Sequence, residues 1–321
     1  MNLFTLVLLV LAFTMDIQST SNNKAVYNAA FSPDSLHVVT VSADTTAVIW
    51  DVETCQLLHR LEAHMDEVYR AVYSPNGEFV ATGGRDRTVV IWEASRGNLH
   101  HILRGHAATI SGLAFSSDQS TLVTADVDGR IIHWDVATGE LVENWQLDVN
   151  EIIKTVLSPD GQYVAAIINQ SISIWDTTSR QLVSTIHAPA LILSATFTFD
   201  SQYIATTGYE MPIARIWDVK TGDEISSVGS GAADSVTNIS FSHNGQMLAA
   251  NSNSNPINRD YETKVYDVSS GKRLFVLREN SEAVVSATFS PTDELLVTGY
   301  YDGTASMWNV NTHDKVCNLD A

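Results

Sequence analysis

Basic residues are scarce in this chain of 321 residues. Its 18 lysines and arginines stand against 37 aspartates and glutamates, which gives a formal net charge of −19 at pH 7. Such a chain has no basic field to neutralise phosphates, so its charge argues against nucleic acids and anionic membrane surfaces as partners. Charged residues of both signs amount to only 17% and hydrophobic residues to 45%, a balance that excludes a disordered chain and predicts a folded core.

The sequence also lacks the motifs of common reaction centres. Two cysteines are too few for a disulfide framework, and no CxxC pair or Cys/His cluster predicts a zinc site. No glycine-rich phosphate loop and no nucleophile-elbow motif occurs. We therefore expect no catalytic residues, no metal and no cofactor, and we predict that the protein is not an enzyme.

Only the N-terminus carries a long apolar run, Leu3 to Phe13 (LFTLVLLVLAF). As a helix it is too short to cross a hydrocarbon layer of about 30 Å, and its length is that of a signal-peptide core. Residues 1–21 are thus predicted to be a signal peptide or hydrophobic N-terminal segment, which favours a secreted or extracytoplasmic location. No basic residue precedes the run, so a strand packed on the domain, or a start codon upstream of the true one, is the alternative, with a cytoplasmic location.

An internal repeat runs through the rest of the chain. An aromatic residue followed by Asp, Glu or Asn ends an apolar run once in each period, and these aromatics step by 42, 42, 41, 42, 49 and 42 residues. The long step coincides with a polar insertion at 251–259. A fixed period near 40 residues predicts a propeller or a solenoid. The repeated aromatics are Trp50, Trp92, Trp134, Trp175, Trp217, Tyr266 and Trp308.

Each period contains short strands separated by turn residues, and none contains an amphipathic helix of useful length. In the second unit we expect strands over 68–73, 78–82, 88–92 and 99–103, with Asn76-Gly77 suited to a tight hairpin turn. Each unit is therefore predicted to be a four-stranded meander. One such sheet cannot bury both of its apolar faces alone, whereas a ring of sheets packed face to face can.

With this repeat the chain resembles the WD-repeat (WD40) β-propeller family over residues 25–321. The resemblance implies an all-β fold, a seven-bladed β-propeller with four antiparallel strands per blade. The fourth strand of the last blade is predicted at 315–319, so the ring would close by packing between blades alone.

Thr, His and Asp recur at fixed distances before the repeated aromatics and could suggest a nucleophile with its base. The family resemblance implies instead a buried hydrogen-bond network that ties the strands of one blade together, because buried polar groups come paired. Two units hold the full set: His64, Thr82, Asp86 and Trp92 in the second, and His106, Thr124, Asp128 and Trp134 in the third. Counting ten residues back from the aromatic also assigns Thr207 to the fifth unit.

The resemblance further implies a non-catalytic scaffold that binds protein or peptide partners on the top face of the propeller. That face is the rim where first strands begin and where the turns between second and third strands lie. Aromatic and arginine side chains dominate binding hot spots. The expected partner-binding residues are Tyr27, Glu67, Tyr69, Arg85, Arg259 and Tyr301.

The acidic charge favours partners that are basic or neutral, and we expect a monomer or a component of a complex. The alternative function is a small-molecule or enzymatic site at the mouth of the central channel. Finally, Cys55 and Cys317 fall near the outer strands of the first and seventh units. Since outer strands of neighbouring blades splay apart, we predict that both are free thiols.

Overall fold

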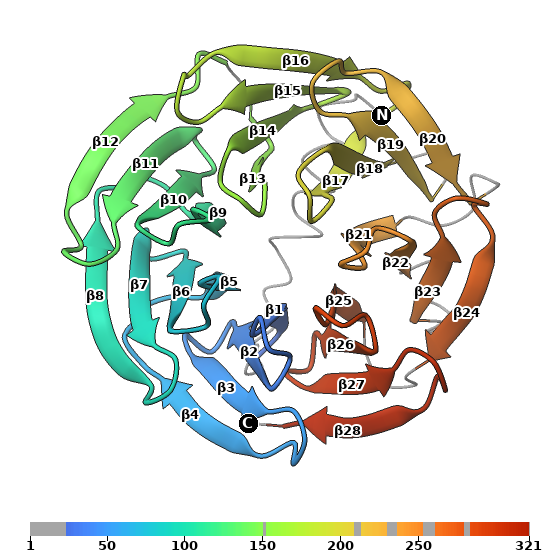
Figure 1. Ribbon diagram of the computed structural model, residues 1–321, viewed down its shortest axis with the longest axis horizontal. Helices are drawn as coiled ribbons and strands as arrows, with labels where there is room; N and C mark the ends of the chain where they lie inside the picture. Colours follow the sequence, from blue (N-terminus) through green and yellow to red (C-terminus); the bar gives the residue numbers. More distant parts are fainter. Residues whose placement is uncertain are drawn as a thin grey trace, which may run out of the picture.

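A computed structural model of the chain describes residues 24–149, 152–208, 213–229, 236–252, 261–278 and 283–320. Within these residues, 28 strands form seven antiparallel four-stranded sheets, arranged as blades around a central axis (Figure 1). The predicted all-β, seven-bladed fold is confirmed. The predicted signal peptide at 1–21 lies outside the described residues. None of the described segments forms a helix long and apolar enough to cross a membrane.

The blades follow one another in chain order. Blade 1 contains β1 (Val26–Phe31), β2 (His37–Ser42), β3 (Ala47–Asp51) and β4 (Leu57–Leu61). Blade 2 contains β5 (Val68–Tyr73), β6 (Phe79–Gly84), β7 (Thr88–Glu93) and β8 (Asn98–Arg104). Blade 3 contains β9 (Ile110–Phe115), β10 (Thr121–Asp126), β11 (Arg130–Asp135) and β12 (Leu141–Gln146). Blade 4 contains β13 (Lys154–Leu157), β14 (Tyr163–Ile168), β15 (Ser171–Asp176) and β16 (Leu182–His187).

The remaining blades repeat this order. Blade 5 contains β17 (Ile192–Phe197), β18 (Tyr203–Gly208), β19 (Ala214–Asp218) and β20 (Glu224–Val228). Blade 6 contains β21 (Val236–Phe241), β22 (Met247–Ser252), β23 (Glu262–Asp267) and β24 (Arg273–Arg278). Blade 7 contains β25 (Val284–Phe289), β26 (Leu295–Tyr300), β27 (Ala305–Asn309) and β28 (Lys315–Leu319). The first strand of each blade lies nearest the axis and the fourth at the circumference (Figure 1).

The core lies between blades rather than within one. For example, Val41 and Leu61 of blade 1 pack in one buried cluster with Val68, Val80 and Trp92 of blade 2. Further clusters of this kind join the other neighbouring blades. Burying a large apolar side chain stabilises a fold by about 1.5–3 kcal/mol, so the repeated aromatics explain why the sheets stack. The packing of blades thus fixes where each rim residue stands.

Ring closure joins blade 7 to blade 1, which lie side by side in Figure 1. Every sheet uses four consecutive strands, so no strand is exchanged between the chain ends. Val26 and Trp50 share a buried cluster with Met307 and Leu319. The Thr288 hydroxyl of β25 also donates a hydrogen bond of 2.9 Å to a backbone carbonyl of β1.

A disulfide between Cys55 and Cys317 also spans this junction, with their Cα atoms 6.6 Å apart. The prediction of free thiols is therefore wrong, and closure does not depend on packing alone. The error has a geometric cause. Cys55 lies in the turn between β3 and β4, and this turn, rather than the outer strand itself, reaches the outer strand of the neighbouring blade.

The same contact recurs at other blade junctions. His59 of β4 lies against Gly97 in the β7–β8 turn, where an added Cβ would come within 2.8 Å of the imidazole side chain. The His59 ring nitrogen is also 3.1 Å from the Ser95 carbonyl. Phe275 of β24 stacks on His313 in the β27–β28 turn, with ring centroids 4.1 Å apart. The disulfide therefore occupies the junction contact between blades 7 and 1.

Candidate functional site

In blade 2, the four predicted residues form a continuous chain of hydrogen bonds. His64 Nδ1 is 2.9 Å from Asp86 Oδ2, and His64 Nε2 is 2.8 Å from Thr82 Oγ1. The indole N–H of Trp92 donates to the same threonine oxygen at 2.9 Å. The His64 side chain is 1% exposed, so a substrate has no access to this imidazole. The arrangement supports a clasp between strands rather than a reaction centre.

The electrostatics of Asp86 support the same interpretation. Burial alone would raise the pKa of this carboxyl, but hydrogen bonds from His64 and from the backbone N–H of Met65 outweigh it and hold the pKa below its usual range. The carboxylate is therefore charged and fully used as an acceptor near neutral pH. A group with no vacant lone pair facing a substrate is poorly suited to general-base catalysis.

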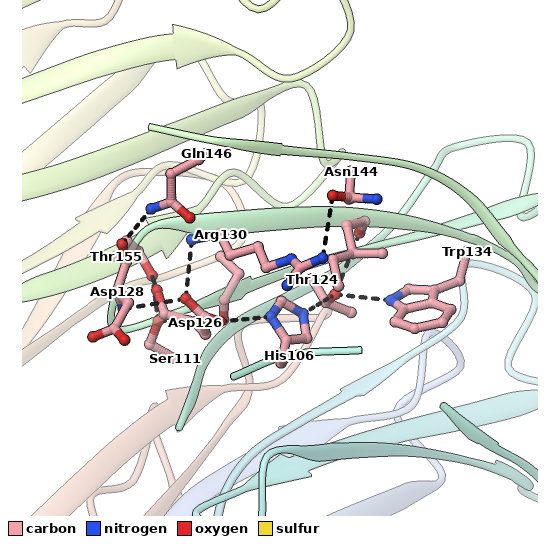
Figure 2. A network of polar contacts seen from close by, with 12 residues as sticks. His106, Ser111, Thr124, Asp126, Asp128, Arg130, Trp134, Asn144, Gln146 and Thr155 are labelled. Atoms are coloured by element: carbon pink, nitrogen blue, oxygen red, sulfur yellow. Dashed lines mark hydrogen bonds and ion pairs between the residues drawn. The ribbon is translucent and has the colours of Figure 1, made fainter. Parts of the chain in front are cut away.

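Blade 3 contains an equivalent network, but its carboxylate comes from a different residue. His106 Nδ1 is 2.9 Å from Asp126 Oδ2, His106 Nε2 is 2.6 Å from Thr124 Oγ1, and Trp134 donates to Thr124 at 2.9 Å. Figure 2 shows Asp126 beside His106, while the Asp128 carboxylate points away from the imidazole. Asp128 is exposed. The prediction that Asp128 belongs to this network is therefore wrong.

The reason lies at the end of the second strand. Asp126 is the last residue of β10, and Gly84 is the corresponding last residue of β6. A Cβ on Gly84 would lie 2.3 Å from the Glu67 carbonyl oxygen, so blade 2 has no side chain there and takes its carboxylate from the following turn. Blade 3 places the carboxylate directly on the strand, two residues after Thr124 and on the same face of the sheet.

The bond from threonine to the indole is the most widespread part of the network. It occurs in blades 1, 2, 3, 5 and 7, with donor–acceptor distances of 2.8–2.9 Å. In blade 5 the acceptor is Thr206, so the assignment of Thr207 is wrong. Ile204 pairs with Trp217, and the threonine that shares its face stands two residues later. The connection to β19 is one residue longer than in blade 2, which defeats counting back from the aromatic.

This difference predicts opposite results for two adjacent substitutions. Thr206→Val leaves a buried indole N–H without an acceptor and should lower the free energy of unfolding by about 1–3 kcal/mol. The Thr207 hydroxyl is buried and has no hydrogen-bond partner in the described part of the chain. Thr207→Val should therefore change the free energy by less than about 0.5 kcal/mol or stabilise the fold. Urea unfolding of both variants measures the difference, and equal losses would contradict the assignment.

The upper rim, defined as the edge where first strands begin and β2–β3-type turns lie, brings four predicted partner-binding residues together. The Tyr27 and Tyr69 rings lie 4.8 Å apart between centroids. The Tyr69 hydroxyl donates a hydrogen bond to the Glu67 carboxylate. Arg85 lies 3.9 Å from Glu67 and 3.8 Å from Asp66, with 57% of its side chain exposed. We call Tyr27, Asp66, Glu67, Tyr69 and Arg85 the rim cluster.

A backbone irregularity positions both tyrosines. The pairing of β1 with β2 skips Tyr27, and the pairing of β5 with β6 skips Tyr69, so each tyrosine is the extra residue of a β-bulge. Bulges redirect a side chain out of the regular alternation. Burial, followed by the bond to Glu67, raises the pKa of Tyr69, so its hydroxyl remains a protonated donor. Sequence reasoning found these residues but not the bulges or Asp66.

The two other predicted rim residues are separate from this cluster. Tyr301 is half-buried at the start of the β26–β27 turn, and its backbone N–H donates to the Ala283 carbonyl at 3.0 Å. Arg259 lies outside the described residues. The structure thus brings together the predicted residues of blades 1 and 2 only.

Comparisons with known proteins agree with this architecture. A family model described as "IFT122 first beta-propeller" matches residues 25–256, and one described as "WD domain, G-beta repeat" matches residues 271–309. Both models describe a propeller or its repeat rather than an enzyme.

Curated relatives match parts of the chain. Human "WD repeat-containing protein 90" is 35% identical over 27% of this chain and 5% of its own length. Arabidopsis thaliana "Cell division cycle 20.1, cofactor of APC complex" is 26% identical over 50% of the chain and 35% of its own length. Drosophila willistoni "Eukaryotic translation initiation factor 3 subunit I" is 28% identical over 37% and 38%. The chain thus spans well under half of each relative. Its sevenfold fold, its repeat and the long family match show that the chain belongs to the WD40-repeat β-propeller family.

Proposed function

We propose that this chain is a non-catalytic scaffold that binds protein or peptide partners through the rim cluster. The observation that carries the proposal is the meeting of two tyrosine rings and a largely exposed arginine at one edge of the ring. Tyrosine and arginine are enriched in the few residues that dominate binding energy. The printed names of two relatives, a complex cofactor and an initiation factor subunit, describe components of assemblies.

Charge supports a partner that is basic or neutral. The chain has a net charge of −19, and the rim cluster itself contains two carboxylates against one guanidinium. Complementary charge speeds association and makes the rate sensitive to salt. The disulfide supports an oxidising compartment for the protein, since disulfides persist in secreted and extracytoplasmic settings.

Two substitutions on the upper rim test the proposal. Tyr69→Ala and Arg85→Glu should each weaken binding of a genuine partner by about 2 kcal/mol, or roughly thirtyfold in Kd. The measurement is quantitative pull-down with the full chain, followed by titration of each recovered protein.

Arg96→Glu is the matched control. Arg96 is an exposed arginine 3.8 Å from Glu93, as Arg85 is from Asp66, but its turn between β7 and β8 lies on the opposite rim. Partners lost from both upper-rim variants and retained by Arg96→Glu support the proposal. Partners that bind all three variants as they bind the unsubstituted chain contradict it.

A further inference from the structure

Two cations stand on the innermost strands, where the chain's many carboxylates are missing. Counted by strand register, one position recurs in all seven first strands, directly after the bulge where one is present. No carboxylate occupies it in any blade. The seven residues are Asn28, Arg70, Gly112, Lys154, Ser194, Asn238 and Ser286.

Hydrogen bonds bring the two cations toward each other. Arg70 of blade 2 donates from Nε to the Ser111 carbonyl of blade 3 at 2.9 Å. The Ser111 hydroxyl in turn hydrogen-bonds Thr155, the neighbour of Lys154 on β13. Between the cations, Gly112 contributes no side chain. Burial lowers the pKa of Lys154 to about 7, and the positive charge of Arg70 lowers it further.

Neither cation has a charged partner within the described residues. Arg70 makes a second hydrogen bond, from Nη1 to the Tyr69 carbonyl at 2.9 Å, so two of its five N–H donors are occupied. The described chain gives the Lys154 ammonium no hydrogen bond or ion pair. Both side chains are only half-buried, so solvent reaches them inside the ring. Unpaired cations held away from bulk water are costly unless an anion joins them.

We propose that Arg70 and Lys154 form a binding site for a small phosphate-class oxyanion inside the central channel. Two positive charges match the charge of a phosphate dianion, and the planar guanidinium suits paired oxygen atoms. The amide of Asn28, at the same level on β1, provides another polar group. The site lies below the rim cluster and uses none of its side chains, so it goes beyond the proposed scaffold function.

Isothermal titration of inorganic phosphate into the full chain, at constant ionic strength, tests the site. We expect one saturable site, with Kd raised at least tenfold, or 1.4 kcal/mol, in Arg70→Gln and in Lys154→Met. Lys272→Gln removes an exposed lysine from a turn and should leave Kd unchanged. A parallel titration with glycerol 3-phosphate distinguishes a phosphate ester from free phosphate, because only a site open on one side accepts the ester.

Thermal unfolding in phosphate-free buffer gives a second readout. Lys154→Met keeps the side-chain stem and removes the charge, so it should unfold at the same or a higher temperature than the unsubstituted chain. Added phosphate should raise the unfolding temperature of the unsubstituted chain and not that of Lys154→Met. Absence of saturable phosphate binding, equal Kd in all variants, or a less stable Lys154→Met would each overturn the site, and none of these results bears on the rim cluster.

Discussion

Replacing Cys55 and Cys317 by serine should lower the free energy of unfolding by about 4 kcal/mol, the largest loss expected from any change in this chain. The disulfide links residues 262 positions apart, and a bond that closes so long a loop restricts the unfolded chain strongly. It also holds the junction where no strand is exchanged between the chain ends. Urea unfolding with and without a thiol reductant measures the loss.

Two controls separate the bond from the packing around it. The double serine variant should not respond to reductant, whereas the unsubstituted chain should fall to its level. His59→Ala alters the same contact at the junction of blades 1 and 2, where no covalent bond exists, and should cost no more than about 1.5 kcal/mol. Reductant-independent stability of the unsubstituted chain would show that the ring does not rely on the disulfide.

Asp126→Ala should lower the free energy of unfolding by about 3–5 kcal/mol, because it leaves His106 buried without its partner. Both side chains of this pair are at most 1% exposed. Asp128→Ala, two residues away on an exposed turn, should change stability by less than about 0.5 kcal/mol. Thermal or urea unfolding of the two variants compares them directly, and equal effects would refute the Asp126 assignment.

Acid should reduce the difference between Asp126→Ala and the unsubstituted chain. Burial alone would raise the pKa of Asp126, but hydrogen bonds from His106 and from the backbone N–H of Arg130 bring it below the ordinary 3.8. A carboxyl with a lowered pKa contributes its full stability above the unfolded value and loses it as pH falls through the folded value. Unfolding measured from pH 6 down to pH 2 should therefore show the two proteins converging at the acid end.

The fold was predictable because its evidence is periodic. Seven aromatics in near-constant register, each preceded by short apolar runs and turn residues, leave few other architectures. The network in blade 2 was predictable for the same reason, since its strand and turn lengths match the repeat. Prediction failed where local length or strand position varied, as with Thr206 in the longer connection of blade 5.

Asp126 could have been recognised from alternation along the strand. Thr124 and Asp126 are two residues apart in one strand and therefore point to the same face, whereas Asp128 follows in the turn. The rim cluster was only partly predictable. Tyrosines at equivalent positions of two neighbouring units indicated a shared surface, but a bulge leaves no mark in the sequence, so the direction of these rings required coordinates.

The disulfide did leave a signal. Cys55 stands five residues after Trp50, as Gly97 does after Trp92, and Cys317 stands nine after Trp308, as His59 does after Trp50. The contact of His59 with Gly97 joins these two offsets across neighbouring blades. Aligning the units therefore places the cysteines at one junction, whereas considering outer strands alone separates them.

The sulfur–sulfur bond also makes most of the polypeptide a covalent circle. A protease that cleaves one turn anywhere between residues 55 and 317 produces two fragments that stay tethered through this bond. Such a nicked molecule would migrate as an intact chain on a non-reducing gel and separate only after reduction. A single cut would therefore neither release a piece of the ring nor dilute its blades from one another.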